Sequence, residues 1–255
     1  MATDDRRSIR GRKALVTGAA SGIGRATAAL LAAEGAHVAA CDVTLPGLES
    51  LASEARAAGH DVRPWQLDVT DEACVRRVVA EVASALGGID ILVNCAGVSI
   101  PAAFGDEAAW QKTFDVNLNG MMRTIREALP HLEACGAGRV VNIASTEGLG
   151  ATPLISPYTA SKHAVIGLTR ALAVEVALKG ITANAICPGP IRTGMTAPIP
   201  EEAKQKWARR NVPMKRYGEP EEIAHSVLSL VLPAASFITG TYLVVDGGLM
   251  ALNTH

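Results

Sequence analysis

The sequence has almost no net charge, and this shortage argues against two classes of partner. Its 24 basic and 25 acidic residues leave a formal net charge of −1. No strong positive field is therefore available to hold a nucleic acid or an anionic membrane surface. One short basic cluster precedes the first apolar run, and we interpret it as a solvated N-terminal arm that consists of Arg6, Arg7, Arg10, Arg12 and Lys13.

Cysteine is also scarce, and its pattern argues against disulfides and zinc. The chain has five cysteines, an odd number, at widely spaced positions that form no C-x-x-C motif. They are Cys41, Cys74, Cys95, Cys135 and Cys187. This usage fits a reducing compartment. The six histidines show no H-x-x-x-H or H-E-x-x-H spacing, so we expect no metal. The N-terminus has no signal-peptide core and no run is long enough to span a membrane, which predicts a cytoplasmic protein.

Aromatic residues make up only 4% of the chain, whereas hydrophobic residues make up 49%. The composition is that of a well-cored globular protein. Short apolar runs alternate with helical patterns, and most of the apolar runs lack strict polar alternation, which is typical of strands covered on both faces. We expect one α/β domain over 1–255, a Rossmann-type doubly wound parallel sheet with helices on both faces. Seven strands are expected, at 13–17, 37–42, 62–68, 89–94, 139–145, 182–187 and 241–246.

The helical patterns lie between these runs, at about 22–34, 48–58, 72–86, 106–134 and 158–178. The longest irregular stretch, residues 188–220, mixes glycine, proline and charge. Irregular segments of that length inside a compact domain are usually functional loops, so we expect a substrate lid at about 190–217.

A glycine-rich turn follows the first strand. In "TGAASGIG" the glycines are Gly18, Gly22 and Gly24, between a strand and a helix. Glycine lets the backbone approach a pyrophosphate, and the following helix N-terminus offers free N–H groups to it. This context favours a dinucleotide site over an ordinary tight turn.

An acidic residue ends the second strand. Asp42 lies 20 residues after Gly22, where a carboxylate accepts hydrogen bonds from the adenosine ribose and repels a 2′-phosphate. Arg25 is the nearest candidate for binding such a phosphate, and it lies outside the turn. We therefore expect NAD as the cofactor. Asp68, at the end of the third strand, either contacts the adenine or caps the helix that begins near Asp71.

Tyr158 and Lys162 are four residues apart, so on a helix they share one face. A charged lysine beside a phenol favours the phenolate and lowers the pKa of the tyrosine, which then exchanges a proton with an alcohol or a ketone. Ser145 precedes Tyr158 by 13 residues, at the end of a predicted strand, where its hydroxyl would hold the substrate oxygen.

Taken in order, these motifs resemble the short-chain dehydrogenase/reductase family. The resemblance covers nearly the whole chain and includes "NCAG" at 94–97, "PGPIRT" at 188–193 and "GTYLVVDGG" at 240–248. Cys95 is a departure, because the family often has asparagine there. The resemblance implies an oxidoreductase that transfers hydride between NAD(H) and a secondary alcohol or ketone. It also implies the catalytic set Asn117, Ser145, Tyr158 and Lys162, with protons leaving through the cofactor ribose, Lys162 and a water positioned by Asn117.

The resemblance further implies a set of residues that contact the cofactor. Lys162 would bind the nicotinamide ribose, and Thr193 would contact the carboxamide. The set is Gly18, Ser21, Gly22, Ile23, Gly24, Asp42, Asp68, Val69, Asn94, Ala96, Gly97, Tyr158, Lys162, Pro188, Gly189, Ile191 and Thr193.

The substrate is less well determined. Ser145, Glu147, Ile155 and Tyr158 are expected to contact it, and the other candidates for the pocket wall are Ser99, Ile100, Leu149 and the segment 195–207. Glu147 would either bind a polar group of the substrate or pair with an arginine of the lid. The basic residues of the lid, which would bind an acidic tail or simply be solvated, are Arg192, Arg209, Arg210, Lys215 and Arg216.

Three functions remain open. The first is an NAD-dependent dehydrogenase of secondary alcohols; the second is a 3-oxoacyl-thioester reductase of the acyl carrier protein type; the third is a catalytically silent nucleotide-binding sensor. Asp42 argues against the second, and the intact catalytic set argues against the third. Family resemblance suggests a homotetramer built through the helices near 106–134 and 158–178 and through the C-terminal strand.

Overall fold

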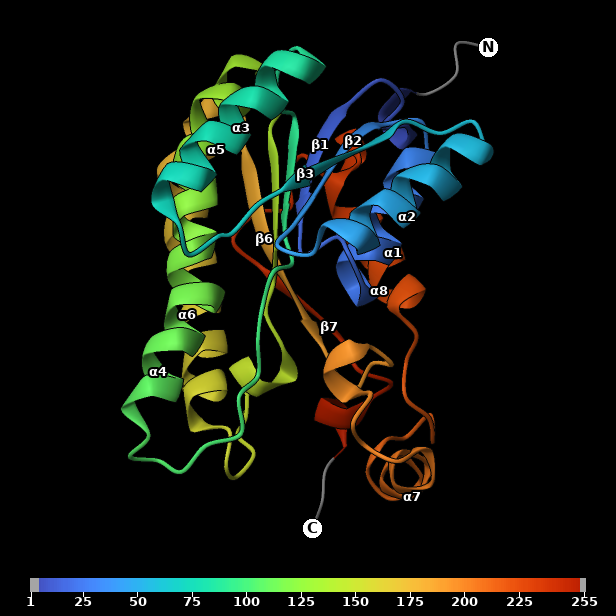
Figure 1. The fold of residues 1–255 in the computed structure, drawn as a ribbon, viewed down its shortest axis with the longest axis vertical. Helices are drawn as coiled ribbons and strands as arrows, with labels where there is room; N and C mark the ends of the chain where they lie inside the picture. The colour runs from blue at the N-terminus through green and yellow to red at the C-terminus, as the bar shows by residue number, and fades with distance from the viewer. Residues whose placement is uncertain (1–4, 253–255) are drawn as a thin grey trace.

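A computed structural model describes residues 5–252, and a seven-stranded parallel sheet forms its centre (Figure 1). The strand order is β3-β2-β1-β4-β5-β6-β7, and all neighbours are parallel. The expected doubly wound Rossmann-type domain is confirmed, although its predicted limits, 1–255, extend beyond the described residues at both ends. The strands are β1 (Lys13–Thr17), β2 (His37–Asp42), β3 (Val62–Gln66), β4 (Ile91–Asn94), β5 (Arg139–Ile143), β6 (Thr182–Pro188) and β7 (Tyr242–Val245).

Helices cover both faces of the sheet (Figure 1). One face carries α3 (Glu72–Leu86), α5 (Gly120–Ala134) and α6 (Ser156–Val176). The other face carries α1 (Gly22–Ala33), α2 (Leu45–Ala57) and α8 (Pro220–Val231).

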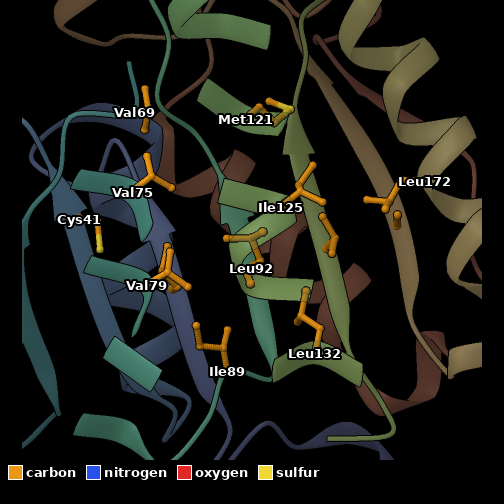
Figure 2. Packing of buried hydrophobic residues seen from close by; sticks show 14 of the residues in the cluster. Cys41, Val69, Val75, Val79, Ile89, Leu92, Met121, Ile125, Leu132 and Leu172 are labelled. Atoms are coloured by element: carbon orange, nitrogen blue, oxygen red, sulfur yellow. The ribbon is translucent and has the colours of Figure 1, made fainter. Parts of the chain in front are cut away.

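Each face has its own apolar core because side chains alternate along the strands. Leu15 of β1 packs under α3 and α5, whereas Ala14 and Val16 of the same strand pack on the opposite side of the sheet. Figure 2 shows the first core, in which Val79 of α3 and Ile125 of α5 lie over the sheet near Leu92. The fully buried apolar strands are therefore explained by two covered faces.

The 106–134 helical prediction is confirmed with one interruption. A short helix, α4 (Glu107–Phe114), leads into a π-helical turn, Asp115–Asn119, before α5 begins at Gly120. Asp106 caps α4 by accepting a hydrogen bond from the Ala109 N–H at 3.0 Å. The π turn brings the side chain of Asn117 to a fully buried position.

Two helices lie between the last two strands, where none was predicted from the sequence. Within the stretch 188–220 lies α7 (Glu201–Asn211), and α8 follows at Pro220. The sequence of α7, "EEAKQKWARRN", has no apolar stripe that would predict a helix. Only Lys204 and Ala208 of this helix are buried. For α8 a signal did exist, since Pro220 stands at the first helical turn and Glu222 closes a capping box with Glu219.

None of the helices within residues 5–252 is long and apolar enough to cross a lipid bilayer.

Candidate active site

A cleft of about 990 Å³ lies at the carboxyl edge of the sheet. Its wall includes residues at or just after the ends of β1, β2, β4, β5 and β6, which surround the point where the strand order reverses. Ligands of open α/β sheets bind at this position. Most of the predicted site residues line the cleft: Gly18, Ser21, Gly22, Ile23, Gly24, Asp42, Asp68, Val69, Ala96, Gly97, Ser145, Glu147, Tyr158, Lys162, Pro188, Gly189, Ile191 and Thr193.

Three predicted residues lie outside this lining: Asn94, Asn117 and Ile155. Asn94 is buried, where it donates to the Asn142 side chain at 2.9 Å and accepts from the Thr124 hydroxyl at 2.6 Å. It therefore joins β4 to β5 and α5 through its side chain, and its predicted contact with the cofactor stays a prediction. Ile155 stands just before α6, and like Ser99, Ile100 and Leu149 it is absent from the cleft wall.

The glycine turn is packed against backbone on two sides. A Cβ on Gly18, whose φ is +68°, would lie 2.7 Å from the Ala96 nitrogen, and a Cβ on Gly24 would overlap the Gly18 oxygen. The turn is tied to the next loop because the Thr17 hydroxyl accepts from the N–H groups of Cys95 and Ala96 at 3.0 and 3.2 Å. Thr17 is a site residue that sequence reasoning missed.

The first turn of α1 has backbone N–H groups that the N-cap side chain does not bind. Ser21 is its N-cap residue, but its side chain makes no capping hydrogen bond. A helix start whose N–H groups are not capped by a side chain is suited to a pyrophosphate. The residues present at this end of the cleft therefore fit a dinucleotide.

Replacing Gly24 by alanine should disrupt the cradle. The added methyl group cannot avoid the Gly18 carbonyl without a backbone shift, and overpacking of this kind costs about 1–3 kcal/mol. We expect a lower free energy of unfolding and at least a tenfold weaker dinucleotide affinity, measured by denaturant unfolding and by fluorescence titration. The matched control is Gly167→Ala, inside α6 with no atom within 4 Å of the new Cβ, which should stabilise the helix. Equal behaviour of the two variants would contradict the assignment.

Asp42 lies at the far end of the cleft from the predicted catalytic residues. Its carboxylate accepts from the Ala20 N–H at 3.1 Å and from the Thr44 N–H at 2.8 Å, one bond on each oxygen. A carboxylate oxygen accepts two hydrogen bonds, so each oxygen retains one site for a ribose hydroxyl. Arg25 is turned to other partners, the Gly47 carbonyl at 3.0 Å and Glu54 at 2.7 Å.

Asp68 also lines the cleft, and the alternative that it caps α3 is wrong. Asp71 is the N-cap of α3 and accepts from the N–H groups of Ala73 and Cys74. Asp68 instead accepts from the N–H and the hydroxyl of Thr70 at 2.8 and 2.7 Å. It therefore shapes the turn that precedes the helix.

Ser145, Tyr158 and Lys162 converge at the other end of the cleft. Ser145 follows β5, and a hydrogen bond joins its side chain to the Tyr158 phenol. Lys162, one helical turn after Tyr158, places its Nζ 5.5 Å from the centre of the phenol ring and donates to the Ile143 carbonyl at 2.8 Å. The proximity predicted from their spacing is thus observed.

The pKa of Tyr158 moves in the direction opposite to our expectation. Burial raises it to about 12; the hydrogen bond with Ser145 opposes this rise, and the Glu147 carboxylate adds to it. Lys162 does not supply the expected lowering, because it is itself buried without a carboxylate partner, and desolvation lowers its pKa to about 8. The side chains alone therefore keep the phenol protonated near neutral pH.

Asn117 stands behind this group. Its amide donates to the Val98 carbonyl at 2.9 Å and to the Ser161 hydroxyl at 3.0 Å, and its oxygen accepts from the Val98 N–H at 2.8 Å. The side chain thus links the π turn to α6. It also lies near Lys162 across Gly97, because a Cβ on Gly97 would be 3.4 Å from the Asn117 oxygen and 3.6 Å from Nζ of Lys162.

Within residues 5–252 Glu147 forms no ion pair with an arginine of the lid, so that alternative is wrong. Its carboxylate accepts from the Thr152 N–H at 3.0 Å, the Thr152 hydroxyl at 2.6 Å and the Thr159 hydroxyl at 2.7 Å. Its own N–H donates to the Ser145 hydroxyl at 3.1 Å. Glu147 therefore connects the turn that carries Ser145 to the helix that carries Tyr158.

Residues 190–217 border the cleft through Pro190, Ile191, residues 193–196 and Trp207. Trp207 stacks on Tyr217 with ring centres 6.0 Å apart. Arg192 is held by Glu201 at 2.6 Å and by Glu219 at 3.1 Å, and it does not line the cleft. Sequence reasoning missed Gly150, Ala151, Thr152, Leu249 and Met250 on the cleft wall. These segments are brought together only by the tertiary fold, so the sequence around each residue does not indicate that it lines the cleft.

The fold and the cleft define a Rossmann-type oxidoreductase that uses a nicotinamide dinucleotide. A family model described as "Enoyl-(Acyl carrier protein) reductase" matches residues 18–250. With this match and the relatives that follow, the chain belongs to the short-chain dehydrogenase/reductase family.

Three similar proteins illustrate the range of this family. The chain is 39% identical to the 3-oxoacyl-[acyl-carrier-protein] reductase FabG of Thermotoga maritima, over 95% of this chain and 99% of the relative. It is 41% identical to the cis-4-hydroxycyclohexanecarboxylate dehydrogenase of Sinomonas cyclohexanicum, over 94% and 97%. A crystal structure of a gluconate 5-dehydrogenase from Burkholderia cenocepacia, in complex with NADP and tartrate, superposes with a TM-score of 0.91 at 33% identity, over 98% and 99% of the two chains.

Proposed function

We propose that this protein is an NAD-dependent dehydrogenase that oxidises a secondary alcohol to a ketone. The observation that carries this proposal is the position of the Tyr158 phenol: it is hydrogen-bonded to Ser145 and stands beside Lys162, in a cleft that continues to Asp42. The test is a panel of secondary alcohols, polyols and hydroxyacyl thioesters, followed through NADH absorbance. If no alcohol in the panel reduces NAD, the proposal is wrong.

The proposed mechanism assigns one task to each side chain. When bound, a nicotinamide dinucleotide supplies the hydride acceptor and, in its oxidised form, a positive charge that favours the Tyr158 phenolate. Ser145 holds the substrate oxygen through its hydroxyl. Tyr158 takes the proton from that oxygen during oxidation and returns it during reduction. Lys162 keeps an ammonium beside the phenol, and Asn117 holds the π turn against α6.

A preference for NAD over NADP is supported by Asp42. A 2′-phosphate placed on the adenosine ribose would meet this carboxylate, and like charges at contact distance repel. Arg25, the nearest basic candidate, is occupied by Gly47 and Glu54. The gluconate 5-dehydrogenase was crystallised with NADP, so the fold alone does not decide the cofactor, and the proposal rests on Asp42.

The variant Asp42→Asn should shift this preference. It removes the charge at nearly constant size, and we expect the ratio of kcat/KM for NAD to that for NADP to fall by about tenfold or more. Initial rates with both cofactors measure the ratio. The control Asp61→Asn removes a carboxylate that binds His37 and Arg63 away from the cleft, and it should leave the ratio unchanged. An unchanged ratio in Asp42→Asn would exclude this role.

A second candidate function is the reduction of 3-oxoacyl thioesters. The likeness to the FabG reductase of Thermotoga maritima favours it, and Asp42 counts against it because reductive biosynthesis generally draws on NADPH. The hydroxyacyl thioesters of the panel separate the two functions. Faster turnover of a thioester with NADP than of any simple alcohol with NAD would favour the second.

We further propose a cytoplasmic homotetramer with a mobile lid at about 190–217. All five cysteines are free thiols, which is compatible with a reducing compartment. Large apolar side chains are exposed on α6, just after it and near β7, among them Val174, Leu178, Phe237 and Leu243, and these surfaces agree with the expected interfaces. Light scattering in solution tests the oligomeric state.

A further inference from the structure

One part of the cleft wall contains a carboxylate and no opposing cation. This part, the outer wall, consists of Glu147, residues 150–152, Met195, Trp207 and Met250. Gly150 and Met250 of the outer wall lie close together, because a Cβ on Gly150 would be 3.9 Å from the terminal methyl group of Met250. The outer wall adjoins the reacting groups, since Glu147 binds the hydroxyl of Thr159, next to Tyr158, at 2.7 Å.

The basic residues of the cleft lie elsewhere. Among the described residues only Lys112 and Lys162 are basic and line it. Lys162 is buried and donates to Ile143. Lys112 shares a neighbouring hollow with Thr70 and Val116, on the side of Asp68.

The lid adds no free cation to the outer wall. Arg192 is bound by Glu201 and Glu219, and Arg216 is bound by Glu222 at 2.6 Å. The other basic residues of the lid do not line the cleft: Lys204, Lys206, Arg209, Arg210 and Lys215. A negatively charged substrate group at the outer wall would therefore face a carboxylate without compensation.

The carboxylate of Glu147 has room for one more donor. Its Oε2 accepts two hydrogen bonds, from Thr152 N–H and the Thr159 hydroxyl, whereas Oε1 accepts only the Thr152 hydroxyl. Each carboxylate oxygen can accept two. A hydroxyl or an ammonium group of a substrate can thus complete the shell of Oε1.

The remainder of the outer wall is apolar. Met195, Trp207 and Met250 are 47%, 42% and 44% exposed, so they offer apolar surface to a substrate. Thioether and indole groups of this kind suit an apolar ring or chain, because burying them on binding removes apolar surface from water.

We propose that Glu147 determines the substrate class of this enzyme: a secondary alcohol with an apolar body and a neutral or cationic donor group, to the exclusion of anionic alcohols. This inference rests on the proposed function, since it concerns the wall of the same site. Glu147 discriminates by repelling a substrate carboxylate and by accepting a hydrogen bond from a hydroxyl or ammonium group.

The test uses three cyclohexanols that differ only at the ring position opposite the reacting alcohol. They are 4-aminocyclohexanol, 1,4-cyclohexanediol and 4-hydroxycyclohexanecarboxylate. We expect the native enzyme to oxidise the amine and the diol with a kcat/KM at least tenfold above that for the carboxylate, on the order of the penalty for one like-charge contact at a partly exposed site. In Glu147→Gln the ratios should fall toward one.

The ratio separates specificity from a merely structural role, because loosening of the Ser145 turn would lower all three rates together. Glu34→Gln, at the carboxyl end of α1, removes an exposed carboxylate away from the cleft and should leave the ratios unchanged. Should Glu147→Gln fail to fold, as judged by thermal unfolding, Glu147→Ala takes its place. If the rings are too slow as substrates, their inhibition constants against the best alcohol of the panel give the same order.

Equal use of the carboxylate and the diol by the native enzyme would overturn this inference and leave the proposed dehydrogenase intact. So would ratios that persist in the Glu147 variants. If no alcohol is oxidised at all, the proposed function itself fails, and the inference fails with it.

Discussion

Replacing Tyr158 by phenylalanine is expected to lower kcat for alcohol oxidation by about 10²- to 10⁴-fold, the usual contribution of a positioned general acid or base. The substitution removes only the phenol oxygen, so the packing of this buried ring is retained. NAD affinity should therefore change little, because the cradle at Gly18 and the carboxylate of Asp42 are untouched. Steady-state kinetics and NAD titration of the same preparation measure both quantities.

The matched control for this substitution is Tyr242→Phe. Tyr242 stacks with the Arg170 guanidinium and does not line the cleft, so loss of its hydroxyl should leave kcat unchanged. If Tyr158→Phe retained most of the native turnover, Tyr158 would not be the proton acceptor, and the whole site assignment would need revision.

The pH dependence of the native enzyme follows from the same group. Burial raises the pKa of Tyr158 to about 12, and oxidation requires the phenolate. We therefore expect kcat/KM for oxidation to increase with pH across the neutral and alkaline range, whereas ketone reduction, which requires the protonated phenol, should stay nearly constant until the pH approaches about 12. In Tyr158→Phe the residual rate should lose this dependence. A flat profile in the native enzyme would show that the phenol does not titrate during the rate-limiting step.

Replacing Lys162 by methionine is expected to abolish most activity and yet to stabilise the fold. Lys162 is 4% exposed, and burial lowers its pKa from 10.5 to about 8. This shift corresponds to about 3 kcal/mol of destabilisation by the charged form. The variant also loses the hydrogen bond to the Ile143 carbonyl, which costs about 1 kcal/mol and offsets part of the gain from removing the buried charge. Near neutral pH the variant should therefore exceed the native free energy of unfolding by about 2 kcal/mol.

The stability gain should depend on pH with a definite sign. Because the pKa of Lys162 is lower in the folded chain than its ordinary value, the folded state binds fewer protons between about pH 8 and 10.5, and the penalty disappears as pH rises through this window. The advantage of Lys162→Met should thus shrink over the same range. Burial raises the pKa of Cys95 and Cys187 above its ordinary value of 9, so these thiols lower the free energy of unfolding as the pH rises above 9. The native protein and the variant must therefore be compared at each pH.

Denaturant unfolding at several pH values measures this difference. Lys179→Met is the control, because the Lys179 ammonium is exposed and binds Glu133 at 2.6 Å. Its effect should be within a fraction of a kcal/mol. A Lys162→Met variant that is less stable than the native protein at neutral pH would contradict the account of a costly buried ammonium.

Local sequence determined the scaffold and most of the dinucleotide cradle. The apolar strands and the 3.6-residue helical periods specify which faces are buried, so the doubly wound sheet follows from pattern alone. Gly18 has a positive φ, which other residues rarely adopt. Asp42 is the last residue of β2, so its position at the edge of the sheet could be predicted from the end of the strand. The four-residue spacing of Tyr158 and Lys162 fixed their common face, because it is one turn of a single helix.

Other features depended on segments far apart in the chain, and only the tertiary structure decided them. The pKa of Tyr158 rises because surrounding elements exclude water from it, which no spacing within α6 expresses. Asn94 turns inward to partners on β5 and α5, and Glu147 meets threonines in place of an arginine. Met250 reaches the outer wall only because the chain folds back after β7. Burial and contact between distant residues are properties of the packed molecule, whereas propensity and periodicity are properties of the sequence.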